Sequence, residues 1–166
     1  RQGVCSTMSV WGIDPGLNGA IALFDLMEGH VEVFDMPIME IKKKRQVNPQ
    51  LLTNILEQHN APVFIEQVGA RPGQGVSSMF NFGKSYGICL GVSAGLKLPT
   101  TTITPLVWQR ALKVEKGKDG NRLRATQIFP NFSSLFARKK DDGRADAALL
   151  AYYGAVFFAD NVDNKE

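Results

Sequence analysis

Four acidic side chains have a spacing that could hold divalent cations. Asp14 ends the apolar run SVWGID, and Glu66 lies near the end of the apolar run PVFIEQV. Asp142 and Asp146 differ by about 400° around a helix, so they share one helical face to within about 40°. Asp141 is an alternative to Asp142, but it points well away from Asp146 on the same helix. Carboxylate oxygens suit hard ions such as Mg²⁺ or Mn²⁺.

These carboxylates repel one another if they converge in space. Two unit charges about 4 Å apart are unfavourable by roughly 4 kcal/mol at an effective dielectric near 20. Such a cluster persists when cations neutralise it or when some of its members stay protonated. Two cations can activate a water and stabilise the leaving oxygen of a phosphodiester. We therefore expect a two-metal site with four residues as catalytic groups and metal ligands: Asp14, Glu66, Asp142 and Asp146.

Each acid also has a purely structural interpretation. Asp14 could cap the backbone amides of the turn PGLNG, and Glu66 could form a salt bridge with Arg71; for each of these two, taken alone, the structural role is about as plausible as the catalytic one. Asp141 or Asp142 could be the N-cap of the last helix. Asp146 is harder to explain in this way, because its neighbours are alanines and leucines that are expected to be buried.

The elements that would position the acids follow from the pattern of apolar residues. Three strand-like runs, Ser9–Asp14, 20–26 and 30–36, form an expected meander, and 62–68 and 100–104 are further strands. We predict helices that begin at Asn48-Pro49 and at Val76, followed by helical segments around 107–112, 119–129 and 145–159. The basic segment 37–47 is predicted to be a mobile loop. This order predicts an α/β fold, a mixed five-stranded sheet flanked by helices.

The predicted helix of about twenty residues from Val76 has glycines at every fourth position: Gly83, Gly87, Gly91 and Gly95. A glycine inside a helix is unfavourable by roughly 1 kcal/mol relative to alanine. Four glycines on one ridge therefore need a packing reason, such as the close approach of another helix or of the sheet.

Composition narrows the class of protein. The chain has 166 residues, enough for one α/β domain, and we divide it into a cloning remnant or tag (1–7), a single domain (8–160) and a tail (161–166). The two cysteines and two histidines do not suggest a disulfide framework or a zinc site. No apolar run is long enough to cross a membrane. We expect a cytoplasmic protein with no membrane contact and no nucleotide cofactor.

Basic residues are concentrated in the second half of the chain. Ten of the nineteen lysines and arginines lie between Thr104 and Arg144, against four acids in the same stretch, and a second basic run covers 42–45. Runs of this kind are often simply solvated surface. Beside an acidic site they are better explained as a rim that binds phosphates.

Three motifs in order resemble those of the RuvC-type Holliday junction resolvases, which belong to the ribonuclease H-like superfamily. GIDPG at 12–16 resembles the first-strand motif, IEQV at 65–68 the second acidic strand, and DGRADA at 142–147 the acidic C-terminal helix. SSMFNFGKSYG at 77–87 is similar to a helix that contributes to a dimer interface in relatives. The resemblance runs through most of residues 8–154.

The resemblance implies a homodimeric, Mg²⁺-dependent endonuclease that nicks four-way DNA junctions symmetrically in DNA recombination and repair. Asp14, Glu66, Asp142 and Asp146 would bind the two ions. The chain would belong to a bacteriophage or divergent branch. Our candidates for DNA phosphate contact are Lys84, Lys116, Lys118, Arg122, Lys139 and Arg144.

Two departures from the family pattern are visible. Bacterial members usually space the last two acids three apart, whereas here they are four apart. The family's aromatic residue after the glutamate corresponds to Gly69; Phe80 or Phe82 could replace it, although core packing is the favoured interpretation for both. The alternative functions are a ribonuclease H acting on RNA–DNA hybrids, a non-catalytic junction-binding module and a nucleotide-binding protein of the actin and sugar-kinase type.

Overall fold

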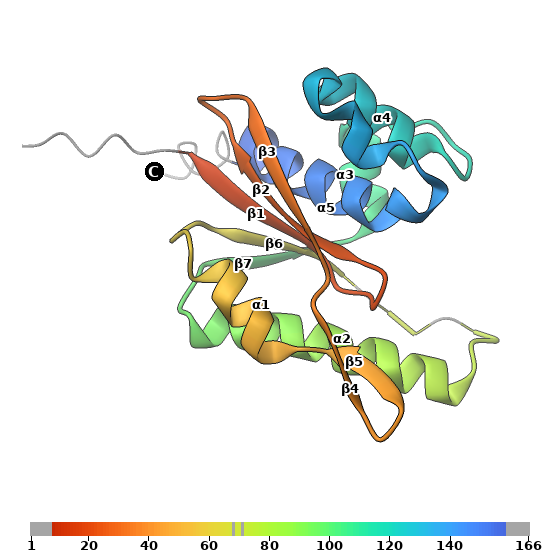
Figure 1. The fold of residues 1–166 in the computed structure, drawn as a ribbon. Coiled ribbons are helices and arrows are strands. Elements are labelled where there is room, and N and C mark those ends of the chain that lie inside the picture. Colours follow the sequence, from red (N-terminus) through yellow and green to blue (C-terminus); the bar gives the residue numbers. More distant parts are fainter. Residues whose placement is uncertain (1–7, 68, 71, 159–166) are drawn as a thin grey trace, which may run out of the picture.

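A five-stranded mixed sheet runs through the centre of the molecule (Figure 1). The structure, a computed structural model, describes residues 8–67, 69–70 and 72–158. β1 (Ser9–Asp14) is antiparallel to β2 (Ala20–Asp25), and β2 is antiparallel to β3 (His30–Asp35). β6 (Val63–Glu66) and β7 (Thr100–Ile103) run parallel to β1. The predicted meander and mixed sheet are thus confirmed. The strands lie in the order β3-β2-β1-β6-β7.

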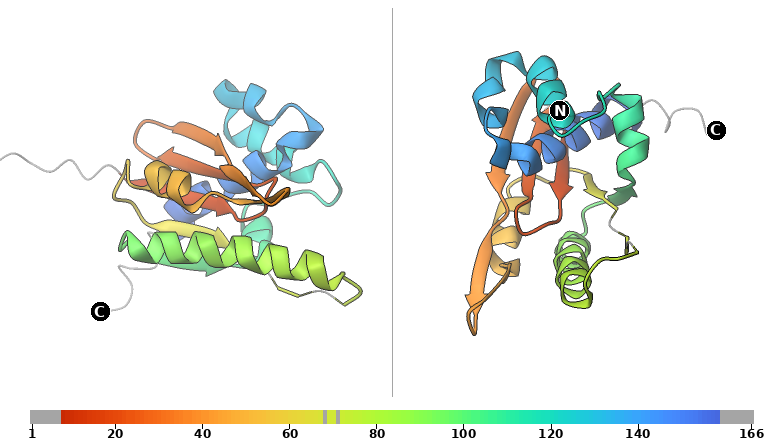
Figure 2. Two further views of the ribbon diagram at one scale, coloured as in Figure 1. Left: turned by 60° about the horizontal axis from the view of Figure 1, so that its bottom comes forward. Right: turned by 90° about the vertical axis from the view of Figure 1, so that its right-hand side faces the viewer.

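Helices cover both faces of this sheet (Figures 1 and 2). One face carries α1 (Pro49–Leu56) and α2 (Val76–Gly95). The other carries α3 (Pro105–Ala111), α4 (Gly120–Ile128) and α5 (Asp142–Tyr153). Short 3₁₀ segments join α4 to α5, and a π-helical turn follows α5. The predicted helices are therefore all present, although the predicted end of the last one, at 159, lies outside the described residues, as do residues 68 and 71.

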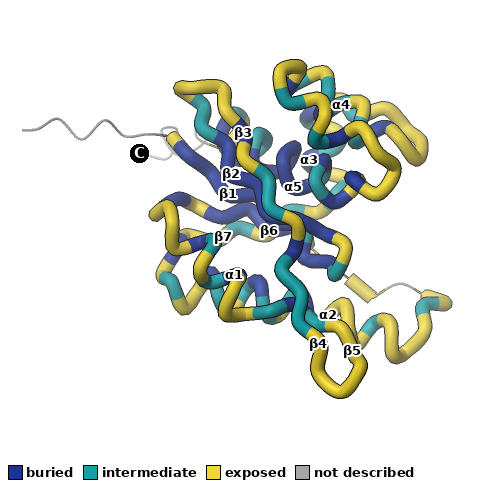
Figure 3. Tube along the Cα trace, viewed as in Figure 1, coloured by how far each residue is buried: buried dark blue, intermediate teal, exposed yellow. Residues whose placement is uncertain are grey.

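Side chains of the central strands alternate between two apolar cores. Trp11, Ile13 and Ile65 pack with α1 and α2, whereas Val10 and Phe64 pack with α5 and its neighbours. Figure 3 shows that β1 and β2 are buried along most of their length. This alternation decides the direction of every strand residue, including the acids at the strand ends.

The segment predicted as a mobile loop is a β-hairpin, and that prediction is wrong. β4 (Ile38–Ile41) pairs antiparallel with β5 (Lys44–Val47), outside the main sheet. Only Lys42 and Lys43 form the turn, and both have positive φ, 50° and 62°. Two-residue turns with two positive φ angles match the twist of a hairpin and normally contain asparagine and glycine. The lysines conceal the hairpin in the sequence.

The glycine ridge of α2 faces open space in the described part of the chain. A Cβ added at Gly83, Gly87, Gly91 or Gly95 would meet nothing within 4 Å. Neither the sheet nor another helix of the same chain explains the ridge, because none of them approaches these glycines.

Among the described residues, no helix is long and apolar enough to span a membrane. The division into residues 1–7, 8–160 and 161–166 stays a prediction, because the two ends lie outside the described residues.

Candidate active site

Asp14 and Glu66 lie next to each other at the ends of parallel strands. Ile13 of β1 is in register with Ile65 of β6, so the residue that follows each of them is at the same level. Ile13 and Ile65 point toward α1 and α2. Because successive side chains alternate in direction, Asp14 and Glu66 point the opposite way, toward α5.

Gly12 lets α5 lie directly on β1. A Cβ at this position would overlap the carbonyl oxygen of Ala147 and crowd the amide of Ala151, both in the backbone of α5. The helix therefore contacts the strand backbone along the turn that begins directly after Asp146, from Ala147 to Ala151. This close approach places the acidic start of α5 beside the acidic end of β1.

Gly143 makes a second close contact at the start of α5. A Cβ here would overlap the carbonyl oxygen of Asn18 and the Cα of Gly19, in the turn between β1 and β2. The helix start is thus seated against the turn that follows Asp14. Asp142 and Asp146 flank this contact on either side.

One cavity of about 750 Å³ contains all four predicted acids: Asp14, Glu66, Asp142 and Asp146 line it together. Its other polar walls come from Asn18 and from the first half of α2, with Ser77, Ser78, Asn81 and Ser85. The structure thus brings together acids that are up to 132 residues apart in the sequence, since 146 − 14 = 132. The serines and Asn81 were not predicted, because no chemical signal marks them in the sequence.

Two donors, one buried and one half-buried, orient the acids, and the sequence analysis missed both. Trp108 of α3 is fully buried, and its Nε1 donates a 3.1 Å hydrogen bond to Oε2 of Glu66. Nδ2 of Asn121 in α4 donates a 2.6 Å hydrogen bond to Oδ1 of Asp146. Gln109 in turn donates to Oδ1 of Asn121. These bonds fix the directions of two carboxylates before any ligand binds.

Asp14 and Asp142 have different partners. The backbone amide of Gly16 donates to Oδ1 of Asp14 at 3.3 Å, so the predicted turn interaction exists within the cavity. Arg122 donates from Nε to Oδ1 of Asp142 at 2.7 Å and also pairs with Asp119. Among the described residues, these bonds engage one carboxylate oxygen each of Asp14, Asp142 and Asp146, and the other oxygen accepts no hydrogen bond.

Asp141, the alternative to Asp142, has a structural role. It is only 1% exposed, and both of its oxygens accept hydrogen bonds from the guanidinium group of Arg138. Its Oδ2 also accepts from the backbone amide of Arg138, which closes a short 3₁₀ turn. These interactions lower the pKa of Asp141, the Arg138 side-chain hydrogen bonds being the largest cause. Asp141 does not line the cavity of the four acids.

The electrostatics of the cavity disfavour four ionised acids. Burial raises the pKa of Asp14 to about 6, against a smaller lowering by the hydrogen bond from Gly16. Burial also raises the pKa of Asp146 well above its ordinary value, and the charges of Asp14, Glu66 and Asp142 raise it further. Cys89 of α2 lies outside this cavity, in the core on the α1 and α2 face of the sheet. Burial raises the pKa of its thiol to about 12, so the thiol stays protonated at neutral pH.

The chemistry of the donor set fits a hard cation, because every acidic ligand supplies oxygen and no described cysteine or histidine lines the cavity. The raised pKa values of Asp14 and Asp146 are expected at a site where a bound cation would neutralise the carboxylates. Within the described residues, no three acidic, histidine or cysteine side chains are already gathered around one point that could hold an ion. Metal binding at these acids therefore requires their side chains to close in on the ion.

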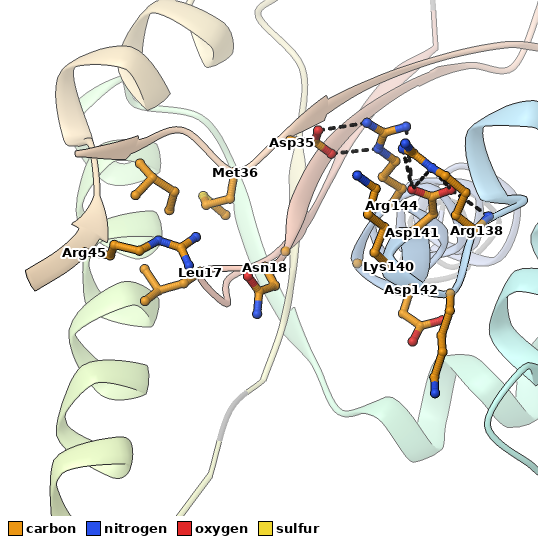
Figure 4. A pocket seen from close by; sticks show the side chains of 14 residues that line it. Leu17, Asn18, Asp35, Met36, Arg45, Arg138, Lys140, Asp141, Asp142 and Arg144 are labelled. Atoms are coloured by element: carbon orange, nitrogen blue, oxygen red, sulfur yellow. Dashed lines mark hydrogen bonds and ion pairs between the residues drawn. The ribbon is translucent and has the colours of Figure 1, made fainter. Parts of the chain in front are cut away.

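Of the six predicted phosphate contacts, Lys139 and Arg144 line a second cavity, and none lines the acidic one. This second cavity of about 690 Å³ adjoins the first and is lined by Arg45, Arg138, Lys139, Lys140 and Arg144, among others. Figure 4 shows Arg45 on one side of it and Lys140 and Arg144 on the other. Leu17, Asn18, Gly19, Asp142 and Gly143 line both cavities.

Among the other candidates, Lys116 and Lys118 are exposed, and Lys84 donates a hydrogen bond to Gln46 of β5. Arg122 is engaged by Asp119 and Asp142, and Arg144 pairs in a bidentate way with Asp35 at 2.7 and 2.8 Å. These two arginines thus have protein partners in the free protein.

Phe80 and Phe82 are not core residues, and the favoured interpretation of both as core packing is wrong. Phe80 is 71% exposed, and Phe82, 38% exposed, lines the acidic cavity.

The fold is a RuvC-type, ribonuclease H-like fold. The chain is similar to two solved structures of Thermus thermophilus RuvC, one of them in complex with a Holliday junction substrate. For that complex, 17% of the residues are identical, the match covers 90% of this chain and 96% of the other, and the TM-score is 0.60. For the second structure, the identity is 18%, the coverages are 89% and 95%, and the TM-score is 0.58. The sequence matches no protein-family model and none of the curated proteins.

Proposed function

We propose that the protein is a Mg²⁺-dependent endonuclease that nicks four-way DNA junctions. The observation that carries the proposal is that Asp14, Glu66, Asp142 and Asp146 line one cavity of a RuvC-type fold. One solved structure with this fold is RuvC in complex with a Holliday junction substrate. The adjoining basic cavity supports a polyanionic substrate, because lysines and arginines attract a phosphate backbone.

The residues of the chain have distinct parts in the proposed reaction. Asp14, Glu66, Asp142 and Asp146 would hold two Mg²⁺ ions, with Mn²⁺ as a substitute. When bound, the ions supply an activated water and stabilise the leaving oxygen of the phosphodiester. Trp108 and Asn121 hold Glu66 and Asp146 in fixed directions through their hydrogen bonds. Lys139 and Lys140 attract the DNA backbone from the neighbouring cavity.

A homodimer completes the proposal. The glycine ridge of α2 is open in the described structure, so the backbone of a second helix can approach it closely. Exposed Val76 and Phe80, at the start of α2, add apolar surface beside the ridge. A two-fold dimer presents two equivalent acidic cavities to two equivalent strands of a junction, which explains paired nicks.

The test is a cleavage assay on three labelled substrates of equal length: a four-way junction, a linear duplex and an RNA–DNA hybrid. We expect paired nicks in the junction with Mg²⁺ and none with a chelator. Asp146→Asn keeps the hydrogen-bonding shape of the side chain but removes its charge, and we expect it to abolish nicking while junction binding remains. Asp141→Asn is the matched control, because Asp141 lies outside the acidic cavity; it should retain nicking if the variant folds.

Two outcomes would replace the proposal. Preferential cutting of the hybrid would identify a ribonuclease H, and junction binding without any Mg²⁺-dependent cutting would identify a binding module. If the affinity for the junction does not fall as the salt concentration rises, the basic cavity does not bind the DNA backbone.

A further inference from the structure

The β4–β5 hairpin is a narrow basic projection with a firmly held base. Val47 at its base is fully buried, Met36 before β4 is nearly so, and the amide of Asn48 donates to the carbonyl of Pro37. Lys84 of α2 donates a hydrogen bond to Gln46, which ties the hairpin to that helix. Figures 1 and 2 show the hairpin extending beyond the helices from this base, and Figure 3 shows an exposed tip.

The tip carries four consecutive positive charges, Lys42 to Arg45, and the only acid in the hairpin is Glu40. In the described part of the chain, none of these four cations forms an ion pair. This differs from the opposite side of the basic cavity, where Arg138 and Arg144 are paired with Asp141 and Asp35. Among the described residues, the hairpin thus presents four cations without an ion pair, against two, Lys139 and Lys140, on the opposite side.

The turn of the hairpin is not occupied by the residues that fit it best. Lys42 and Lys43 both lie in the left-handed region, which is disfavoured for residues with a Cβ, whereas asparagine and glycine suit it. Folding alone therefore gives no reason for two lysines at this turn. Strained conformations of this kind are associated with functional sites.

Arg45 connects the hairpin to the proposed site. It lines the basic cavity (Figure 4) together with Lys139 and Lys140. This cavity shares a wall with the acidic cavity. The tip lies farther out than Arg45 along the same projection. A DNA strand that ran from the acidic cavity past Arg45 would leave Lys42 and Lys43, at the tip, available to other DNA.

We infer that the β4–β5 hairpin is a second DNA contact, in which Lys42, Lys43 and Lys44 bind the phosphate backbone of a junction arm next to the arm that is cut. This inference rests on the proposed function and adds a source of preference for branched DNA. A linear duplex has no second arm at this place, so the hairpin contributes more to junction binding than to duplex binding.

The test is the double variant Lys42→Asn/Lys43→Gly, which installs the preferred turn and removes two charges. It is compared in an Asp146→Asn background, so that binding is measured without cutting. We expect an equal or higher Tm, because the turn is relieved. We also expect roughly a tenfold weaker affinity for the junction at moderate salt, a salt slope smaller by about 2, and a lesser change for linear duplex.

Lys43→Gly and Lys97→Gly are matched single variants. Lys97 also has a positive φ, 57°, and is exposed, but it precedes β7 at the end of the sheet opposite to Asp14 and Glu66. Equal junction affinities for these two variants would overturn the inference, as would an equal loss of junction and duplex binding in the double variant. Neither result touches the proposed function, which instead fails if the unmodified protein does not cut junctions with Mg²⁺.

Discussion

Trp108 donates its indole N–H to Glu66 at 3.1 Å, across 42 residues of sequence. The bond links α3 to the end of β6. The indole is fully buried and Glu66 is half-buried at the cavity, so the bond holds the carboxylate from the protein side. Trp108 is therefore a positioning residue for a proposed metal ligand.

Trp108→Phe keeps an aromatic ring but removes the donor. We expect about tenfold slower junction nicking at limiting Mg²⁺, partly restored at high Mg²⁺, and a stability loss of about 1–2 kcal/mol from the lost hydrogen bond. The measurement is the rate of nicking across a Mg²⁺ titration, together with a denaturant curve.

Trp11→Phe is the matched control for that experiment. Trp11 is also fully buried, and its Nε1 donates a bond of the same length to the carbonyl of His59, in the core on the other face of the sheet. It should lose similar stability but keep the Mg²⁺ dependence of the unmodified protein. The same Mg²⁺ shift in both variants would show that Trp108 acts only on stability.

Stability in chelator should depend on pH with an unusual sign. The pKa of Asp14 is about 6 in the folded protein and 3.8 as a free side chain, so the folded state holds the proton more tightly. Its contribution is present below about pH 4 and is lost as the pH rises through 6, by at most about 3 kcal/mol. Asp146 adds a change in the same direction.

The measurement for this prediction is the free energy of unfolding between pH 4.5 and 8. Without metal, Asp14→Asn should flatten the decrease and make the protein more stable at pH 8, since a buried repelling charge is gone. Mg²⁺ at pH 8 should stabilise the unmodified protein more than this variant. A steeper decrease in the variant would contradict the assigned electrostatics.

Gly143→Ala tests the contact between α5 and the turn after β1. Helix propensity alone favours alanine by about 1 kcal/mol. We expect the opposite sign, a loss of about 1–3 kcal/mol, because the added methyl group overlaps the backbone of Asn18 and Gly19. Nicking should fall as well, because Asp142 and Asp146 move with the helix.

Gly69→Ala provides the comparison, since a Cβ at Gly69 meets no described residue within 4 Å. Its unfolding free energy should stay within about 0.5 kcal/mol of the unmodified protein. A stabilised Gly143→Ala variant would mean that the close contact is absent in solution.

The glycine ridge predicts a point variant that separates subunits. Gly87→Leu fills the middle of the open ridge, and by sedimentation velocity we expect a folded monomer for this variant and a dimer for the unmodified protein. Asn54→Leu, on the exposed surface of α1, adds the same side chain and should leave the dimer intact. If the unmodified protein is a monomer at micromolar concentration, the glycine ridge is not a dimer interface.

Most of the fold could be predicted from the sequence because its signals are local. Apolar runs define β1, β2 and β3, and Asn48 caps α1 by accepting from the amide of Leu51. The convergence of Asp14 and Glu66 follows from two strand ends, and that of Asp142 and Asp146 from helical spacing. The β4–β5 hairpin was not predicted because its two turn residues are lysines, whereas such turns are usually recognised in a sequence by asparagine and glycine.

The remainder of the site depends on tertiary contacts. Trp108 and Asn121 are ordinary helical residues in the sequence, and only the packing of α3 and α4 against α5 and the sheet brings them to the acids. The buried pairing of Asp141 with Arg138 likewise depends on a short 3₁₀ turn that has no sequence signature. The interpretation of Glu66 as a partner of Arg71 stays open, because residue 71 lies outside the described residues.

Leu17, Asn18 and Gly19 form a wall shared by two cavities of different charge: five basic and three acidic residues line one, and four acids and no basic residue among the described residues line the other. On one side a phosphate backbone is attracted, and on the other it is repelled until cations arrive. Binding of DNA and its entry into the acidic cavity should therefore be separable steps. In chelator the strand should bind only in the basic cavity, and after addition of Mg²⁺ it should move past Asn18 to the carboxylates.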